Sequence, residues 1–201
     1  RRPLVYFDQD QLTAYRPASL KLSIADDGVG QRFLVLAGYE PDFGWDTFAA
    51  AVVELAEEFD VSSVTWVHSI PMPVPHTRPL GMTVSGNRRE LIDVHSVWRP
   101  HTQVPATIGH LLELRFGEAG LSVAGFVLLV PHYLADTEHP GVAVAALEAI
   151  GIATGLALTR DEMREASREF LAKIQLQIEG NDELNRMVIG LEERYDSYMA
   201  G

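Results

Sequence analysis

The chain has 201 residues, of which 16 are lysine or arginine and 28 are aspartate or glutamate, giving a formal net charge of −12. It contains no cysteine, which excludes disulfide frameworks, cysteine-ligated metal sites and cysteine nucleophiles. The acidic balance argues against nucleic acid and anionic membranes as partners, because both require a basic surface.

Length, composition and hydropathy indicate a globular, cytoplasmic protein of one medium-sized domain, or of one domain with an appendage. The chain is 47% hydrophobic and 22% charged, which is ordinary for a folded domain. No run reaches the roughly 18 apolar residues that a membrane-spanning helix needs, and no signal peptide is visible. Because the chain starts Arg1-Arg2-Pro3 without a methionine, we expect a further N-terminal segment to precede it.

The first third of the chain predicts strands followed by a helix. Apolar runs and alternating side chains predict strands at Leu4–Asp8, Ser19–Ala25 and Phe33–Ala37, the last two forming a hairpin. A helix is predicted over about Phe43–Phe59, because apolar residues recur there at spacings of three and four. Asp42 is the expected N-cap of this helix.

The middle of the chain alternates strands with helices. Strands are predicted at Ser63–Ile70, Leu80–Ser85 and the nearly all-apolar Leu121–Val130. One helix is expected to open at Pro105 and stop at Gly117, and another to run from Pro140 to about Gly155. Hairpin-like and crossover connections both occur, so we expect an α/β sandwich with a mixed sheet.

The last fifth predicts a C-terminal helical hairpin. Thr159 and Glu162 have the spacing of a capping box at the start of a helix. Gly180-Asn181-Asp182 then separates this helix from a second one. The expected organisation is an α/β core over residues 1–157 and a hairpin appendage over residues 158–201.

Standard catalytic motifs are absent from the sequence, and three loops beyond predicted strand ends hold the reactive side chains. In the first loop, Glu40 and Asp42 form either a tight turn with a helix cap or part of a ligand site. In the third loop, Pro131–Tyr133, which follows the most apolar predicted strand, we interpret His132 as a hydrogen-bonded packing residue rather than a ligand-binding one. His110 and Glu113 form an H-x-x-E pair, which we interpret as a satisfied or solvent-facing histidine rather than a metal site; no metal is expected.

The second loop, Pro71–Pro79, is the strongest candidate. Ser69 stands just before it, and four prolines stiffen the backbone that presents His76, Thr77 and Arg78. Such a loop can position a general acid and an anion clamp. It can equally be a structural connector in which the arginine pairs with an acid.

The apolar stripe of the C-terminal hairpin also has two interpretations. It packs against its own domain or sister helix, or it forms an exposed face for a partner subunit. The candidate interface residues are Phe170, Ile174, Leu184, Val188, Leu191 and Tyr195.

Three segments of the chain carry a resemblance to a known family. GYEPDFGWDTFAAAV, SIPMPVPHTRPLGMTV and VPHYLADTEHPGVAVAALEAIGIATGL resemble the proteasome assembly chaperone 2 family in its bacterial, actinobacterial-type branch. The resemblance spans nearly the whole chain and implies a three-layer α/β/α core of phosphorylase/hydrolase-like fold with C-terminal helices. It also implies homo-oligomers, in bacteria homotrimers, without implying an activity.

The resemblance extends to partners only in part. Archaeal and eukaryotic relatives help to assemble proteasome α-rings, partly through a C-terminal tail of a hydrophobic residue, a tyrosine and any residue. This chain ends Tyr198-Met199-Ala200-Gly201 and departs from that pattern. Either the natural chain extends further or this docking mode does not apply.

The leading hypothesis is therefore a non-enzymatic interaction protein, related to assembly chaperones, that needs no cofactor and forms a homo-oligomer. The alternative is a small-molecule site for a nucleoside- or phosphate-like ligand, with or without hydrolase or phosphorylase activity. Glu40, His76, Thr77 and Arg78 would line that site.

Overall fold

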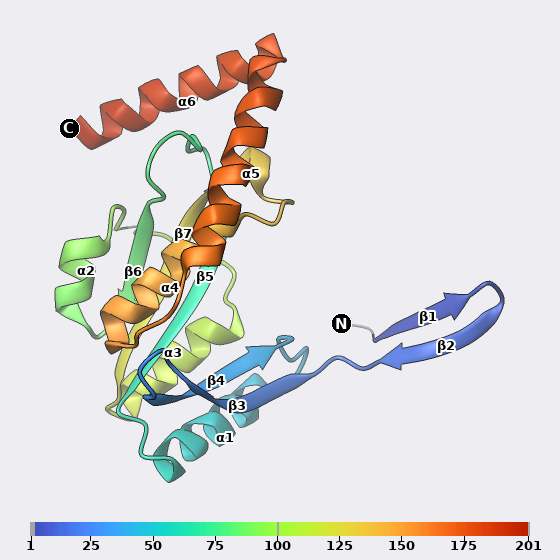
Figure 1. The fold of residues 1–201 in the computed structure, drawn as a ribbon. Helices are drawn as coiled ribbons and strands as arrows, with labels where there is room; N and C mark the ends of the chain where they lie inside the picture. Colours follow the sequence, from blue (N-terminus) through green and yellow to red (C-terminus); the bar gives the residue numbers. More distant parts are fainter. Residues whose placement is uncertain (1–2, 100, 201) are drawn as a thin grey trace.

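A three-stranded mixed sheet lies at the centre of the computed structural model, which describes residues 3–99 and 101–200 (Figure 1). The strand order is β5–β7–β6, with bounds Ser63–Met72, Ser122–Pro131 and Met82–Gly86 respectively. β7 pairs in parallel with β5 and antiparallel with β6. The mixed sheet predicted from the sequence is thus confirmed.

Helices cover both faces of this sheet and make three layers. α2 (Arg89–His95) and α4 (Pro140–Thr154) lie on one face, where they bury Ala124 and Phe126 of β7. α1 (Trp45–Glu58) and α3 (Ile108–Glu118) lie on the other, where they bury Val123. Because successive side chains of a strand point to opposite faces, β7 contributes to both cores. The predicted three-layer fold is confirmed.

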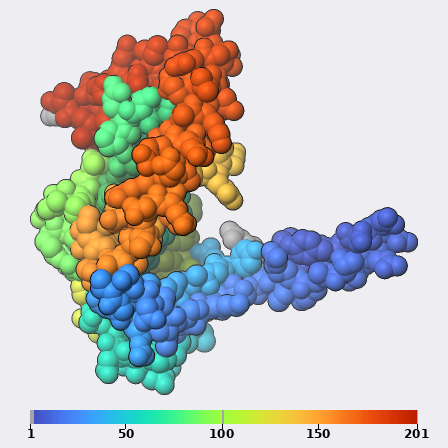
Figure 2. All heavy atoms as spheres, viewed as in Figure 1, coloured from blue at the N-terminus to red at the C-terminus, as the bar shows by residue number. Residues whose placement is uncertain are grey.

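Two antiparallel hairpins precede the sheet. β1 (Leu4–Asp8) pairs with β2 (Gln11–Arg16), and β3 (Leu20–Asp26) pairs with β4 (Arg32–Gly38), as predicted for the second pair. β2 is not predicted by the sequence, because its alternation of polar and apolar residues extends only over Gln11–Ala14. β1 and β2, which we call the N-terminal arm, project well clear of the body (Figures 1 and 2).

Two C-terminal helices follow the core, as predicted. α5 (Asp161–Glu179) packs on α4, and α6 (Asp182–Ala200) follows after a short break. α6 turns away from α5 at a steep angle and lies beside the loop between β5 and β6 (Figure 1). None of the helices in the described residues combines the length and apolar character that a bilayer crossing requires.

The predicted N-cap of α1 is wrong. The helix begins at Trp45, and Gly44 is the N-cap, with a φ of 71° and no side-chain cap. The Trp45 indole Nε1 donates to the carbonyl of Pro41 over 2.7 Å and closes a turn in front of the helix. Glycine adopts this left-handed conformation at little cost, so the turn ends at Gly44 rather than at Asp42.

The predicted capping box at Thr159 is also wrong. α5 begins at Asp161 after Arg160, which makes no side-chain cap, so Glu162 stands at the second helical position instead of the third. A capping box forms instead at α3, where Thr107 is the N-cap and His110 its partner. That helix begins three residues after the expected Pro105.

The close approach of β7 to its neighbours gives the first testable expectation. A Cβ on Gly125 would lie 2.3 Å from Glu113 Oε2 and 2.5 Å from Trp66 Nε1. Gly125→Ala should therefore lower the free energy of unfolding by about 2 kcal/mol, because overpacking strains a filled interior. Urea unfolding followed by circular dichroism measures this change.

The matched control is Gly190→Ala, where an added Cβ meets nothing within 4 Å inside α6. It should raise the free energy of unfolding by about 0.5–1 kcal/mol, because alanine favours a helix interior. Equal stability of the two variants would contradict the packing described for Gly125.

Candidate functional site

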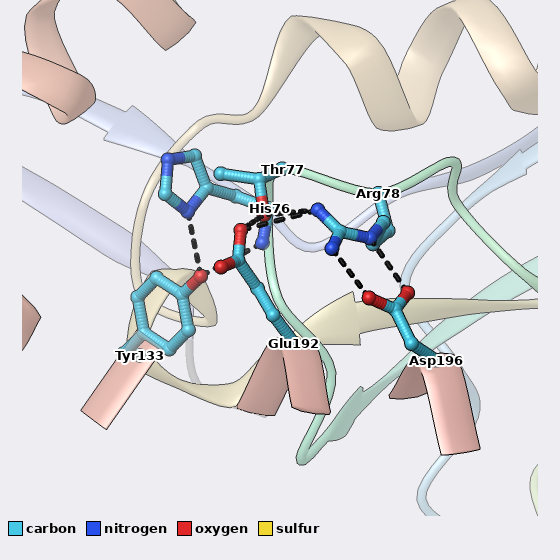
Figure 3. Close-up of polar contacts among 6 residues, drawn as sticks. All are labelled: His76, Thr77, Arg78, Tyr133, Glu192 and Asp196. Atoms are coloured by element: carbon cyan, nitrogen blue, oxygen red, sulfur yellow. Dashed lines mark hydrogen bonds and ion pairs between the residues drawn. The ribbon is translucent and has the colours of Figure 1, made fainter. Parts of the chain in front are cut away.

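The loop between β5 and β6 is held at His76 by a tyrosine of the short helix η1 (His132–Leu134), as Figure 3 shows. The His76 backbone N–H donates to the Tyr133 hydroxyl oxygen over 2.8 Å, and His76 Nδ1 lies 2.7 Å from the same oxygen. The two rings meet edge to face with their centroids 5.9 Å apart. His76 is therefore positioned by the segment that directly follows β7.

The same loop is fastened to α6 by charged hydrogen bonds (Figure 3). Arg78 donates twice to Asp196, from Nε to Oδ1 over 2.8 Å and from Nη2 to Oδ2 over 2.6 Å. Arg78 Nη1 donates to Glu192 Oε1 over 3.2 Å, and the Thr77 hydroxyl donates to that same oxygen. Bidentate arginine–carboxylate pairs of this kind fix orientation as well as charge.

Charge and burial set the protonation states around the loop. Hydrogen bonding to Asp196 raises the pKa of Arg78, and the guanidinium in turn lowers the pKa of the Asp196 carboxyl. Burial lowers the pKa of His76 and raises the pKa of Tyr133. At neutral pH the loop thus carries the charged Arg78–Asp196 ion pair beside a neutral His76.

This geometry favours the connector interpretation of the loop. All three guanidinium nitrogens of Arg78 donate to carboxylates of α6, so the side chain anchors a helix. Tyr195 strengthens the same contact, because its hydroxyl donates to the Pro79 carbonyl over 3.4 Å. Thr77 and Arg78 are therefore engaged in joining α6 to the core, while His76 joins the loop to η1.

The other sequence candidates do not converge on this loop. The Glu40 carboxylate accepts the backbone N–H of Ile108 at the start of α3, and Glu40 lines a large cavity of about 990 Å³. Ser69 lines a strand-end cavity of about 440 Å³ beside α4. Asp42 precedes α1, and His132 is exposed in η1. None of the loop's three candidates lines either cavity.

A polar cluster beside the large cavity is not predicted by the sequence. Trp66 Nε1 and Ser85 Oγ each donate to Glu113 Oε2 over 2.7 Å. His110 Nδ1 accepts the backbone N–H of Thr107 over 3.0 Å, so the H-x-x-E pair is satisfied within the fold. The one feature of the sequence that points to this cluster is Gly125 at the middle of β7, because a glycine inside a strand indicates that other groups approach its backbone closely.

Of the six candidate interface residues of the C-terminal helices, two are buried, three are half-buried and one is exposed. Val188 and Leu191 are buried, with 4% and 1% of their surface exposed, whereas Leu184 is 37% exposed. Phe170, Ile174 and Tyr195 are half-buried, and the Phe170 ring lies 4.8 Å from that of His139. In residues 3–99 and 101–200 no group of three metal-ligating side chains is placed to hold an ion.

The chain matches one protein-family model and is similar to several solved structures. The PAC2 family model matches residues 1–178. Rv2714, a Mycobacterium tuberculosis protein of unknown function, is 39% identical with a TM-score of 0.93, over 100% of this chain and 70% of that one. A Corynebacterium glutamicum ATCC 13032 protein of unknown function is 30% identical with a TM-score of 0.91, over 98% and 74%.

A more distant structure shares the fold alone. The Mycobacterium tuberculosis proteasome-assembly chaperone homologue Rv2125 is 17% identical with a TM-score of 0.82, over 93% of this chain and 80% of that one. No curated protein matches the chain.

Replacing the Arg78 guanidinium with an ammonium should weaken the attachment of α6 to the core. Arg78→Lys keeps the charge but loses the two parallel bonds to Asp196, because an ammonium cannot form the planar fork. Backbone amides of α6 should then exchange with deuterium severalfold faster, while those of β7 stay unchanged. Arg168→Lys is the control, since Arg168 forms an ion pair with exposed Glu165 one turn away on α5. Unchanged exchange in α6 would rule out an anchoring role.

Acid should destabilise the junction around His76. An unfolded histidine has a pKa near 6.5, and burial holds the folded value lower, so the unfolded chain binds the proton first. The free energy of unfolding that neutral His76 contributes is therefore fully present above about pH 7.5. It decreases once the pH falls below 6.5 and is lost as the pH falls through the lower pKa of the folded state. Urea unfolding at pH 7.5 and 5.5 should show a smaller loss in His76→Gln than in the unsubstituted chain. His101→Gln, at an exposed position, should leave the loss unchanged.

Proposed function

The chain belongs to the PAC2 family, and from that premise we propose that it is a non-catalytic, cytoplasmic interaction protein of the assembly-chaperone kind that works as a homotrimer. The resemblance of the chain to the actinobacterial branch of this family is confirmed by the match to the family model and by the similar structures from Mycobacterium and Corynebacterium. The single observation that carries the proposal is the exposed apolar surface of the N-terminal arm.

The arm presents large apolar side chains that its own body does not cover. Leu4, Phe7, Leu12 and Tyr15 each expose more than half of their surface. An isolated two-stranded hairpin is marginally stable in water, and exposed apolar patches mark protein interfaces. A protein partner that covers the arm supplies the burial that the hairpin lacks.

The side chains suspected of chemistry support a non-catalytic role. Arg78 anchors α6, Glu40 accepts the first helical N–H of α3, and Glu113 holds a tryptophan and a serine. The alternative small-molecule site loses its geometric basis, because Glu40 lines one cavity while the His76 loop lies outside it.

Proteasome subunits are the first partners to test, because a structure with this fold is a proteasome-assembly chaperone homologue. Light scattering at micromolar concentration should give the mass of three chains. In mixtures with separately purified proteasome α and β subunits from the same source, the chain should co-elute with assembly intermediates and change the yield of complete particles.

An unrelated acidic protein of similar size controls for non-specific association in these mixtures. A monomer at every concentration tested would contradict the homo-oligomer. Assembly-competent subunits that neither bind the chain nor assemble differently in its presence would contradict the chaperone-like role.

A further inference from the structure

The large cavity of about 990 Å³ is bounded by the β3–β4 hairpin, by β5 and by the layer of α1 and α3. Much of its wall is apolar. Leu22 and Leu36, which lie opposite each other in the hairpin, line it together with Leu55 of α1 and Phe116 of α3. Small-molecule pockets in proteins have volumes of roughly 300–1,000 Å³. The cavity therefore has the size and the lining to hold a ligand with a long apolar body.

The charged residues that line this cavity lie toward its two ends. β4 begins at Arg32 and is followed by Glu40, and a strand of this length spans about 20 Å. α1 then runs back along the hairpin over a similar length and is followed by Asp60 (Figure 1). Arg32 and Asp60 therefore share one end, where their charges are opposite, and Glu40 lies at the other.

The end at Glu40 holds two carboxylates with oxygens to spare. Glu40 accepts the Ile108 N–H through Oε1, and Glu113 accepts both of its donors, Trp66 and Ser85, through Oε2. The second oxygen of each carboxylate takes no part in these bonds. Neither is among the buried polar atoms that lack a partner in residues 3–99 and 101–200, so both are open to the cavity that these residues line.

Two aromatic rings connect the carboxylates. Trp66 and His68 stand at alternate positions of β5 and share a face, with their ring centroids 6.3 Å apart. Burial lowers the pKa of His68, and His110 lowers it further against the opposing effect of Glu40. His68 is therefore neutral at neutral pH and adds no positive charge. The face of a tryptophan ring attracts cations, so the rings and the carboxylates favour the same kind of ligand.

These groups select the charge of a ligand. An anion would be repelled by the two carboxylates, and a neutral apolar molecule would remove water from them without replacing it. A carboxylate that loses water without gaining a partner is costly, whereas a cation compensates for that loss. A protonated amine carries both the charge and three N–H donors on one small group.

We propose that the end of the cavity formed by Glu40, Trp66, His68 and Glu113 binds the protonated amino group of a small amine, whose apolar body lies along the leucines of β3 and β4. The site does not involve the loop of His76, which lines no part of this cavity. It goes beyond the proposed function, because it needs neither a protein partner nor self-association.

Two ligands of equal chain length and opposite charge test the proposal on the unsubstituted, full-length chain. Isothermal titration calorimetry at pH 7.5, below the micelle concentrations of both, should show that decylamine binds saturably with one molecule per chain. Decanoate should bind at least about tenfold more weakly, because its carboxylate faces two others. Absent or non-saturable binding of decylamine, or equal affinity for the two, would overturn the proposal.

A single substitution locates the amino group. Glu40→Gln keeps an oxygen that can accept the Ile108 N–H but removes the charge, so decylamine should bind about tenfold more weakly. An unchanged near-ultraviolet circular dichroism spectrum shows that the fold is retained. Glu54→Gln, at an exposed position of α1 that does not line the cavity, is the matched control and should leave the affinity unchanged.

The control separates a built site from the general attraction of a cation to an acidic chain. Both variants change the net charge by the same amount, so equal weakening in the two would contradict an amine site at Glu40. The comparison of decylamine with decanoate decides the question even if Glu40→Gln does not fold. The proposed interaction role is tested separately, since neither result alters the expected partners.

Discussion

Strand β7 can be buried on both faces only because helices close over each side of the sheet. Phe126 points into the layer of α2 and α4, and Val123 into the layer of α1 and α3. β7 also supplies the pairing edge for both neighbouring strands, so the positions of β5 and β6 follow from it. The glycine at its centre lets Glu113 and Trp66 approach the backbone, which no larger residue there would permit.

The sequence predicts the parts of this fold that depend on local burial. The near-continuous apolar run of β7 and the helical spacing of α1 are both determined by which faces are buried. Helix starts are predicted less well, because a cap depends on the turn before it. The Trp45 indole bound to the Pro41 carbonyl moves the start of α1, and no periodicity records that bond.

The candidate site could be predicted only as residue types. The loop of His76, Thr77 and Arg78 is conspicuous for its prolines, but its acidic partners stand far along the chain. Arg78 and Asp196 are 118 positions apart, and only the path of α6 across the body brings them together. The same path explains why Val188 and Leu191, which look like an interface stripe, are buried within the chain.

The order of elements along the chain has a consequence for synthesis. The arm leaves the ribosome before any part of β3, α1 and α3, whose side chains line the large cavity. A nascent chain therefore exposes this apolar hairpin before the strands and helices of the core have been made. Asp8 ends β1 and Asp10 lies in the turn, and negative charge at the end of an exposed hairpin disfavours edge-to-edge pairing with other strands.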